Sequence, residues 1–183
     1  MSIEYDYLNS NNNRNIYNTN TLLYNCGGYA LNTFNWYYPR NTLDDEEMSD
    51  LDEIWCYREE KLEIILVNNN YNIINILNSY ALRDSYFMIQ EFSGRLRRIN
   101  AVDELKNDER AIAYRLGHDS CDEELDFHFM FKNYNDTKWS HKMGSFKPEN
   151  NKFTDDYVLN NYWKFGDYCY DSNIILMAIK LKT

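Results

Sequence analysis

The sequence predicts an α+β domain in which N-terminal helices pack on an antiparallel β-sheet. Three observations lead to this fold class. Before about residue 82, apolar residues recur at three- and four-residue spacings, as they do along one face of a helix. From about residue 87 onward, short apolar runs separated by turn residues take their place. At 183 residues, the chain has the size of one domain with its own core.

The start of the packed domain is expected near residue 21. Residues 1–20 show little apolar periodicity and include Asn11-Asn12-Asn13, which predicts a mobile or edge-lying lead-in. Residues 21–183 are expected to form a single domain. From Cys26 onward, apolar residues recur at roughly helical spacing until Pro39. Cys26 is therefore expected at the beginning of a helix and not in its middle.

Two further helices are expected, at residues 54–67 and 71–82, with an asparagine run between them. The stretch before them, residues 41–53, is strongly acidic and predicts a solvated loop or the first turns of a helix. A calcium loop needs ligands at alternating positions and a central glycine, which this stretch lacks. A calcium site is therefore not expected.

The second half of the chain is expected to consist mainly of strands and turns. The predicted strands cover residues 87–92, 96–99, 110–116, 125–132, 138–142 and 174–181, with a short helix at 102–106. Ser93-Gly94 is expected to turn the first two strands into a hairpin. The turn residues at 133–137 are expected to fold one strand back onto an antiparallel partner.

Composition excludes several classes of function. A formal net charge of −10 would repel a nucleic-acid backbone or an anionic membrane, so neither is an expected partner. No apolar run approaches the roughly twenty residues that span a bilayer, and the N-terminus is too polar for a signal peptide, so we expect a cytoplasmic protein. The four cysteines form no CxxC pair, which favours reduced thiols and no metal or cofactor. The sequence indicates nothing about oligomeric state.

Cys26 is the best candidate nucleophile in the chain. It lies in the segment N-C-G-G-Y-A-L at residues 25–31, where a thiol followed by two glycines suits a tight turn that opens a helix. Such a turn is expected to expose the sulfur. The free N–H groups and the positive end of a helix favour the thiolate over the thiol.

His128 is the natural partner of that thiol. It lies in L-D-F-H-F-M-F at residues 125–131, an alternating pattern typical of a strand. An imidazole beside the sulfur can take its proton, and a third group can hold the ring in one orientation and tautomer. For this third group, Asp126 shares the face of His128, while either Ser140 or His141 on the next strand can face the ring. Of the three, we prefer His141.

These segments resemble motifs of the papain-like cysteine peptidase and amidase superfamily. N-C-x-x-Y-A at residues 25–30, and D-x-H at 126–128 followed by W-S-H-K-x-G at 139–144, are similar to segments of NlpC-type and CHAP-type enzymes. They are also similar to segments of small bacterial and phage proteins. The resemblance implies a papain-like fold, with a helix-borne cysteine followed by a histidine on a strand of an antiparallel sheet.

The resemblance also implies a role for each candidate residue. Cys26 corresponds to the nucleophile, His128 to the general base and His141 to the third residue, which is often histidine in NlpC-type enzymes. The Cys26 N–H would form an oxyanion hole together with a second donor, either the Asn25 side chain or a tyrosine such as Tyr24.

The expected function is that of a cysteine hydrolase, a peptidase or amidase that cleaves an amide bond through a thioester. Its substrate would be a peptide or protein, such as a host protein or a wall peptide if the chain is phage-encoded. The alternative is a catalytically inert, acidic phage-type protein that inhibits a host defence protein. In that case, the acidic residues at 44–53 would mimic a phosphate backbone.

Overall fold

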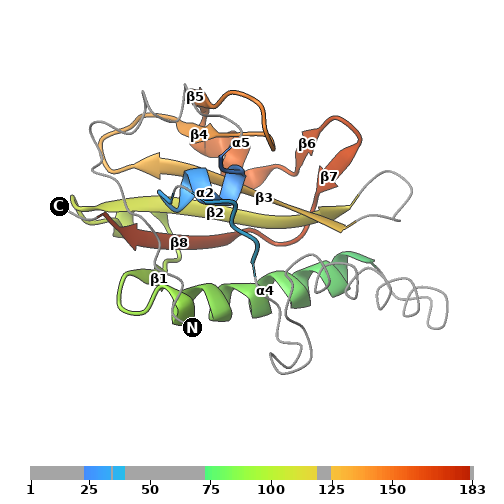
Figure 1. The fold of residues 1–183 in the computed structure, drawn as a ribbon, viewed down its shortest axis with the longest axis horizontal. Helices are drawn as coiled ribbons and strands as arrows, with labels where there is room; N and C mark the ends of the chain where they lie inside the picture. Colours follow the sequence, from blue (N-terminus) through green and yellow to red (C-terminus); the bar gives the residue numbers. More distant parts are fainter. Residues whose placement is uncertain (1–22, 34, 40–72, 119–124, 182–183) are drawn as a thin grey trace.

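The computed structural model describes residues 23–33, 35–39, 73–118 and 125–181 (Figure 1). The expectations for residues 1–20, for the acidic run at 41–53 and for a helix at 54–67 lie outside these ranges.

The described residues contain three α-helices, one 3-10 turn and eight strands. In chain order they are α2 (Cys26–Ala30), α4 (Ile73–Glu91), β1 (Leu96–Arg98), the 3-10 turn Val102–Glu104, β2 (Glu109–His118), β3 (Leu125–Asn133), β4 (Trp139–His141), β5 (Glu149–Phe153), α5 (Asp155–Asn160), β6 (Trp163–Phe165), β7 (Tyr168–Tyr170) and β8 (Ile175–Lys180).

All eight strands belong to one antiparallel sheet, as the sequence predicts for an α+β fold. Six of them follow the order β1-β8-β2-β3-β4-β5, while β7 pairs with both β2 and β6. The longest ladder joins β2 to β3, from Arg110 opposite Asn133 to His118 opposite Leu125. This ladder carries the central part of the sheet, so it fixes where the side chains of β3 point.

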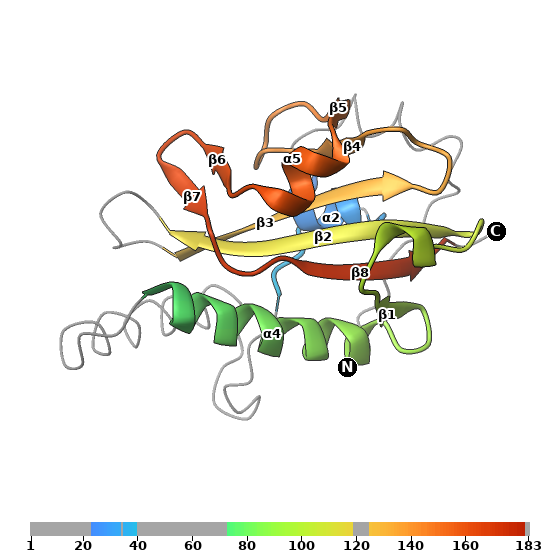
Figure 2. The ribbon, with the colours of Figure 1, turned by 180° about the vertical axis from the view of Figure 1, so that it is seen from behind.

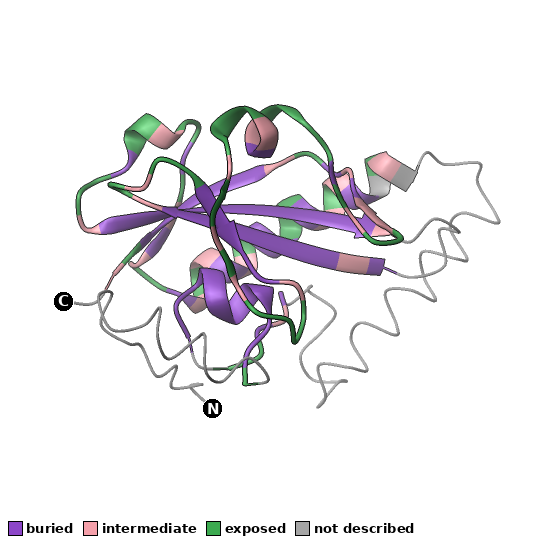
Figure 3. Ribbon diagram, turned by 90° about the horizontal axis from the view of Figure 1, so that it is seen from above, coloured by how far each residue is buried: buried purple, intermediate pink, exposed green. Residues whose placement is uncertain are grey.

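The two faces of the sheet carry different layers. Figures 1 and 2, which view the molecule from opposite sides, place α2 and α5 on opposite faces. Because side chains alternate along a strand, Phe127, Phe129 and Phe131 of β3 pack in one core cluster with α2 and α4. Met130 packs in a second cluster with residues of α5, β6 and β7. The central strands and α2 are buried (Figure 3).

Helix α2 begins at Cys26, which confirms the expected start, but it ends at Ala30 instead of continuing toward Pro39. The Asn25 side chain bonds both to the first turn of α2 and to the chain that returns past it. Its Oδ1 accepts from the Gly28 N–H, which caps the helix, and from the Tyr37 N–H, each at 3.0 Å. The chain that returns past α2 comes so close that a Cβ at Gly28 would lie 2.0 Å from the Asn35 carbonyl oxygen. Continued helix is incompatible with this return.

The prediction of a β-hairpin around Ser93-Gly94 is wrong, because a helix and not a strand precedes this turn. Helix α4 runs on to Glu91, through residues predicted as a strand. Leu77, Ala81 and Met88 are fully buried at helical spacing, so packing of this one face outweighs the β propensity of the residues around Met88. Gly94, at φ +72°, then turns the chain into β1.

The predicted strands at 96–99, 110–116, 125–132, 138–142 and 174–181 are confirmed as β1, β2, β3, β4 and β8. The short helix expected at 102–106 is a 3-10 turn. Elements β5, α5, β6 and β7 were not predicted. Among the described helices, none is both long and apolar enough to cross a bilayer.

Candidate active site

Cys26 lies where α2 meets the edge of β3. Within the described chain, β4 pairs with β3 only at Met130 and Phe131, which leaves the first half of that edge to other partners. The Cys26 sulfur occupies it, with Sγ donating to the Phe127 carbonyl oxygen at 3.8 Å. The expectation of an exposed sulfur is wrong, because only 5% of Cys26 is accessible.

Burial also sets the protonation state of this thiol. The pKa of Cys26 is raised to about 12, chiefly by burial and in addition by the charge of Asp126. Hydrogen bonds from the Phe129 and Gly27 backbone and the charge of Lys142 oppose this rise without cancelling it. The short helix does not supply the expected thiolate. The resting sulfur is a neutral thiol.

His128 points from β3 to the opposite face of the sheet from Cys26. Its ring centroid lies 6.1 Å from that of Trp163, 5.0 Å from that of Phe165 and 5.2 Å from that of Tyr170. These aromatic rings leave 2% of His128 accessible. Burial therefore lowers the pKa of His128 well below its ordinary value, and the neighbouring His141 adds to this effect.

A chain of hydrogen bonds leads from His128 toward the surface. His128 Nε2 lies 2.9 Å from His141 Nδ1, and His141 Nε2 lies 2.7 Å from an Oε2 carboxylate oxygen of Glu149. The ladder that places His141 opposite both Met130 and Glu149 makes this chain possible. Glu149 was not predicted as a site residue.

The carboxylate determines which nitrogen carries each proton. The pKa of Glu149 is lowered by its bonds to Lys152 and His141, so it is ionised, and burial lowers the pKa of His141. A neutral His141 must then donate from Nε2 to Glu149 and accept at Nδ1 from His128 Nε2–H. His128 Nδ1 is left as the basic nitrogen, with no hydrogen-bond partner among the residues described.

Cys26 and His128 meet in one cavity of about 140 Å³. Its lining consists of Asn25, Cys26, Trp36, Tyr38, Asp126, Phe127, His128, Met143, Gly144 and Tyr170. The thiol reaches the cavity from one face of the sheet and the imidazole from the other, at the edge of β3. In the described structure no hydrogen bond joins the Cys26 sulfur to either histidine.

The two residues proposed to support the oxyanion lie beside the nucleophile but have other contacts. The Asn25 Nδ2 group donates to the Tyr37 carbonyl oxygen at 2.8 Å, in addition to the capping role of Oδ1. The Tyr24 ring is buried, with Lys142 Nζ 4.8 Å from its centroid. Burial lowers the pKa of Lys142 to about 8, and its charge acts on Cys26.

Of the three alternatives for the third group, the structure places His141 against His128. Ser140 points to the other face of β4, where its Oγ accepts from the Asn151 N–H at 2.9 Å. Asp126 shares the face of His128, as expected, and accepts from the Tyr170 hydroxyl at 2.5 Å. It makes no hydrogen bond to His128.

Two residues of the site, Glu149 and Tyr170, were not predicted, and neither has a clear local sequence signal. Glu149 opens β5, whose sequence E-N-N-K-F has no strand-like alternation, so no local pattern could have found it. Tyr170 belongs to the three-residue strand β7, which is too short to show a period.

No group of three or more His, Cys, Asp or Glu side chains suited to a metal ion occurs in the described ranges. The two cysteines in those ranges, Cys26 and Cys169, are free thiols. Fold and site together define an α+β protein with a buried thiol and a His-His-Glu relay around one cavity. Comparisons with protein-family models, with curated proteins and with solved structures give no match.

Proposed function

We propose that this protein is a cysteine hydrolase of the papain-like type, a peptidase or amidase acting on a peptide or protein substrate. The observation that carries the proposal is the His128–His141–Glu149 relay behind a cavity that Cys26 shares. A buried hydrogen-bonded chain that ends at a carboxylate is the arrangement that orients a general base. The motif resemblance supports the same assignment.

In the acylation step, His128 Nδ1 takes the proton of the Cys26 thiol as the sulfur attacks the substrate carbonyl carbon. The new C–S bond forms while the carbonyl π electrons move to oxygen. When the tetrahedral intermediate collapses, the C–N bond breaks and the imidazolium returns its proton to the leaving amine. The products of this step are a Cys26 thioester and a free amine.

In the deacylation step, His128 removes a proton from a water molecule that attacks the thioester carbonyl carbon. Collapse of this second intermediate breaks the C–S bond and returns the proton to the sulfur. The acid product leaves and the thiol is restored. Each step returns the relay to its starting protonation state.

The pKa shifts of Cys26 and His128 suit this order of steps. Burial favours the neutral thiol and the neutral imidazole, so the proton moves during attack and not before it. His141 and Glu149 then stabilise the imidazolium that forms, since Glu149 faces His141 at 2.7 Å. The Cys26 N–H in the first turn of α2 is the proposed oxyanion donor. Asn25 is not, because its amide holds the Tyr37 carbonyl.

Acylation by p-nitrophenyl acetate tests the proposal without knowledge of the natural substrate. We expect a burst of p-nitrophenolate and a single acetyl thioester, located at Cys26 by peptide mass spectrometry. Cys26→Ala should abolish the burst, and Cys169→Ala should leave it unchanged. Acetylation spread evenly over Cys26, Cys56, Cys121 and Cys169 would refute the proposal.

The competing proposal is an inert papain-like scaffold that works by binding a host protein through its acidic surface. The environment of Cys26 favours it: the sulfur is buried, its pKa is raised, and it bonds to a backbone carbonyl. The acylation experiment separates the two proposals. A protein of this second kind gives no burst, and its partner binding survives Cys26→Ala.

A further inference from the structure

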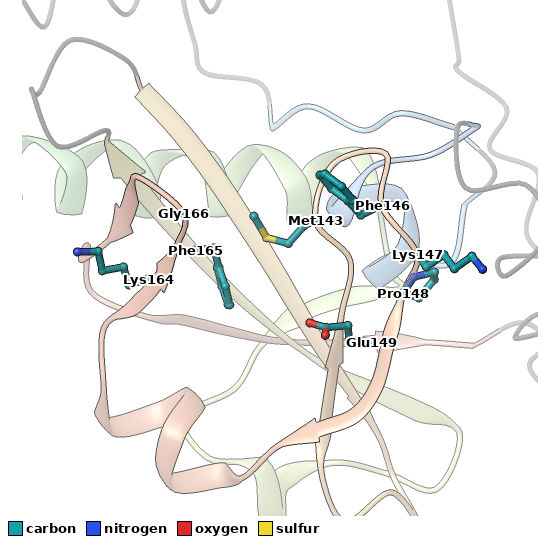
Figure 4. Close-up of a pocket in the computed structure, with 8 residues that line it drawn as sticks. All are labelled: Met143, Phe146, Lys147, Pro148, Glu149, Lys164, Phe165 and Gly166. Atoms are coloured by element: carbon teal, nitrogen blue, oxygen red, sulfur yellow. The ribbon is translucent and has the colours of Figure 1, made fainter.

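A second hollow, of about 800 Å³, lies beside the candidate active site. Its lining consists of Met143, Phe146, Lys147, Pro148, Glu149, Lys164, Phe165 and Gly166. The first four come from the segment between β4 and β5, Glu149 opens β5, and the last three come from the β6–β7 hairpin. Figure 4 shows Met143, Phe165 and Glu149 directed toward the same central space. We call this hollow the hairpin groove.

The hairpin groove adjoins the cavity of Cys26. Met143 lines both of them. Phe165, on the opposite wall, has its ring centroid 5.0 Å from that of His128 and 4.8 Å from that of His141. A ligand in the groove therefore lies against the outer side of the relay and within reach of the nucleophile's cavity.

The floor and one wall of the groove are apolar. Met143 and Phe165 are half-buried and line its centre, while Phe146 is 74% exposed. An exposed phenylalanine beside an open apolar hollow marks a surface that gains free energy when a large apolar side chain covers it. The groove thus suits an aromatic or branched aliphatic side chain.

The free charges at the groove are positive, although the whole chain carries a net charge of −10. Glu149, its one carboxylate, is already bonded to His141 and to Lys152. Lys147 and Lys164 are exposed on opposite flanks of the groove (Figure 4), and neither forms an ion pair with a described residue. A ligand with carboxylates on both sides of its apolar group matches this pattern.

We propose that the hairpin groove binds an extended peptide segment in which a large apolar side chain is flanked by acidic residues. The apolar side chain packs between Met143 and Phe165, and the carboxylates face Lys147 and Lys164. That this segment is the one presented to Cys26 rests on the proposed function. Binding itself does not depend on it.

Fluorescence anisotropy with three labelled pentapeptides tests the proposal. Gly-Glu-Phe-Glu-Gly should bind more tightly than Gly-Lys-Phe-Lys-Gly, which reverses the charges, and than Gly-Glu-Ser-Glu-Gly, which lacks the apolar group. The double variant Lys147→Glu, Lys164→Glu should weaken binding of the first peptide about tenfold, and so should Phe146→Ala. Lys138→Glu changes an exposed lysine that does not line the groove and should leave binding unchanged.

Equal binding of the three peptides, no measurable binding of any of them, or unchanged binding by the double lysine variant would overturn the inference. All four changed residues are exposed, so a folded variant is expected in each case, and its circular dichroism spectrum checks this. Cys26→Ala should bind the first peptide as the wild type does. Because acylation of Cys26 by p-nitrophenyl acetate does not involve the groove, failure of one proposal leaves the other intact.

Discussion

The two faces of β3 are built in different ways. Cys26 approaches from the face where three phenylalanines, α2 and α4 form an apolar core, and its hydrogen bonds are to backbone groups. His128 lies on the other face, in a polar relay that passes through His141 to the partly exposed Glu149. Groups from opposite faces of a sheet meet only at an edge. The part of the β3 edge that β4 does not pair with therefore makes the candidate site possible.

The difference between the faces also assigns roles. The apolar surroundings on the Cys26 face keep the sulfur as a neutral thiol. The proposed base, His128, comes from the other face. The relay side has a fixed tautomer and a route for positive charge toward a carboxylate. A buried polar chain is stabilising only when every member is paired, so the histidine face should respond most strongly to substitution.

Among the residues that support Cys26 and His128, the largest effect is expected from His141→Phe, which keeps an aromatic ring but removes both nitrogens. His128 then loses the partner that fixes its tautomer, and its Nε2–H is left buried. We expect acylation of Cys26 by p-nitrophenyl acetate to slow about 100-fold. Unfolding in urea should show a loss of about 1–3 kcal/mol.

Ser140→Ala is the matched control for this substitution, since Ser140 is the neighbouring residue of β4 and faces away from His128. It should leave the acylation rate within about twofold of the wild type. A rate that falls equally in both variants would mean that β4 matters only for packing.

A smaller effect is expected from Glu149→Gln. The amide oxygen can still accept from His141 Nε2–H but carries no charge to stabilise an imidazolium, so acylation should slow about tenfold. Lys152→Met removes the other bond of this carboxylate at 2.6–2.7 Å without touching His141. If that variant slows the reaction as much as Glu149→Gln does, the carboxylate acts through surface charge and not through the relay.

The smallest effect is a dependence of stability on pH. Burial lowers the pKa of His128 and of His141 below the ordinary value of 6.5. As pH falls below about 6.5, the unfolded chain therefore binds more protons than the folded one. The free energy of unfolding should decrease between about pH 7.5 and about pH 5, as measured in urea.

The double variant His128→Phe, His141→Phe should show a flatter profile over the same interval. Glu149 does not contribute there, because its lowered pKa makes its contribution disappear only below about 4.5. A double variant with the slope of the wild type would place the titrating groups elsewhere.

Local signals predicted the parts of the site that depend on local structure. The thiol followed by two glycines predicts a helix that begins at Cys26, and α2 begins there. The alternation around His128 predicts its strand, and the turn after β3 brings His141 back beside it. Strand alternation also separates His141 from Ser140, because only one of them can share the face of His128.

The parts that depend on distant packing were not predictable in this way. Cys26 is buried because the chain returns past it at Tyr37 and because it meets the edge of β3; neither contact has a sequence signature. Glu149 becomes a relay member only through the pairing of β5 with β4. Helix α4 extends past its predicted end because Met88 packs in the core.

The central claim is that an imidazole from one face of β3 activates a thiol from the other. The most direct test is the rate of Cys26 acetylation by p-nitrophenyl acetate in the wild type relative to His128→Ala, with His118→Ala as a control for loss of a histidine elsewhere. The account predicts a ratio of at least about 100 for His128→Ala and about 1 for His118→Ala. Equal rates in the wild type and in a folded His128→Ala variant would contradict it.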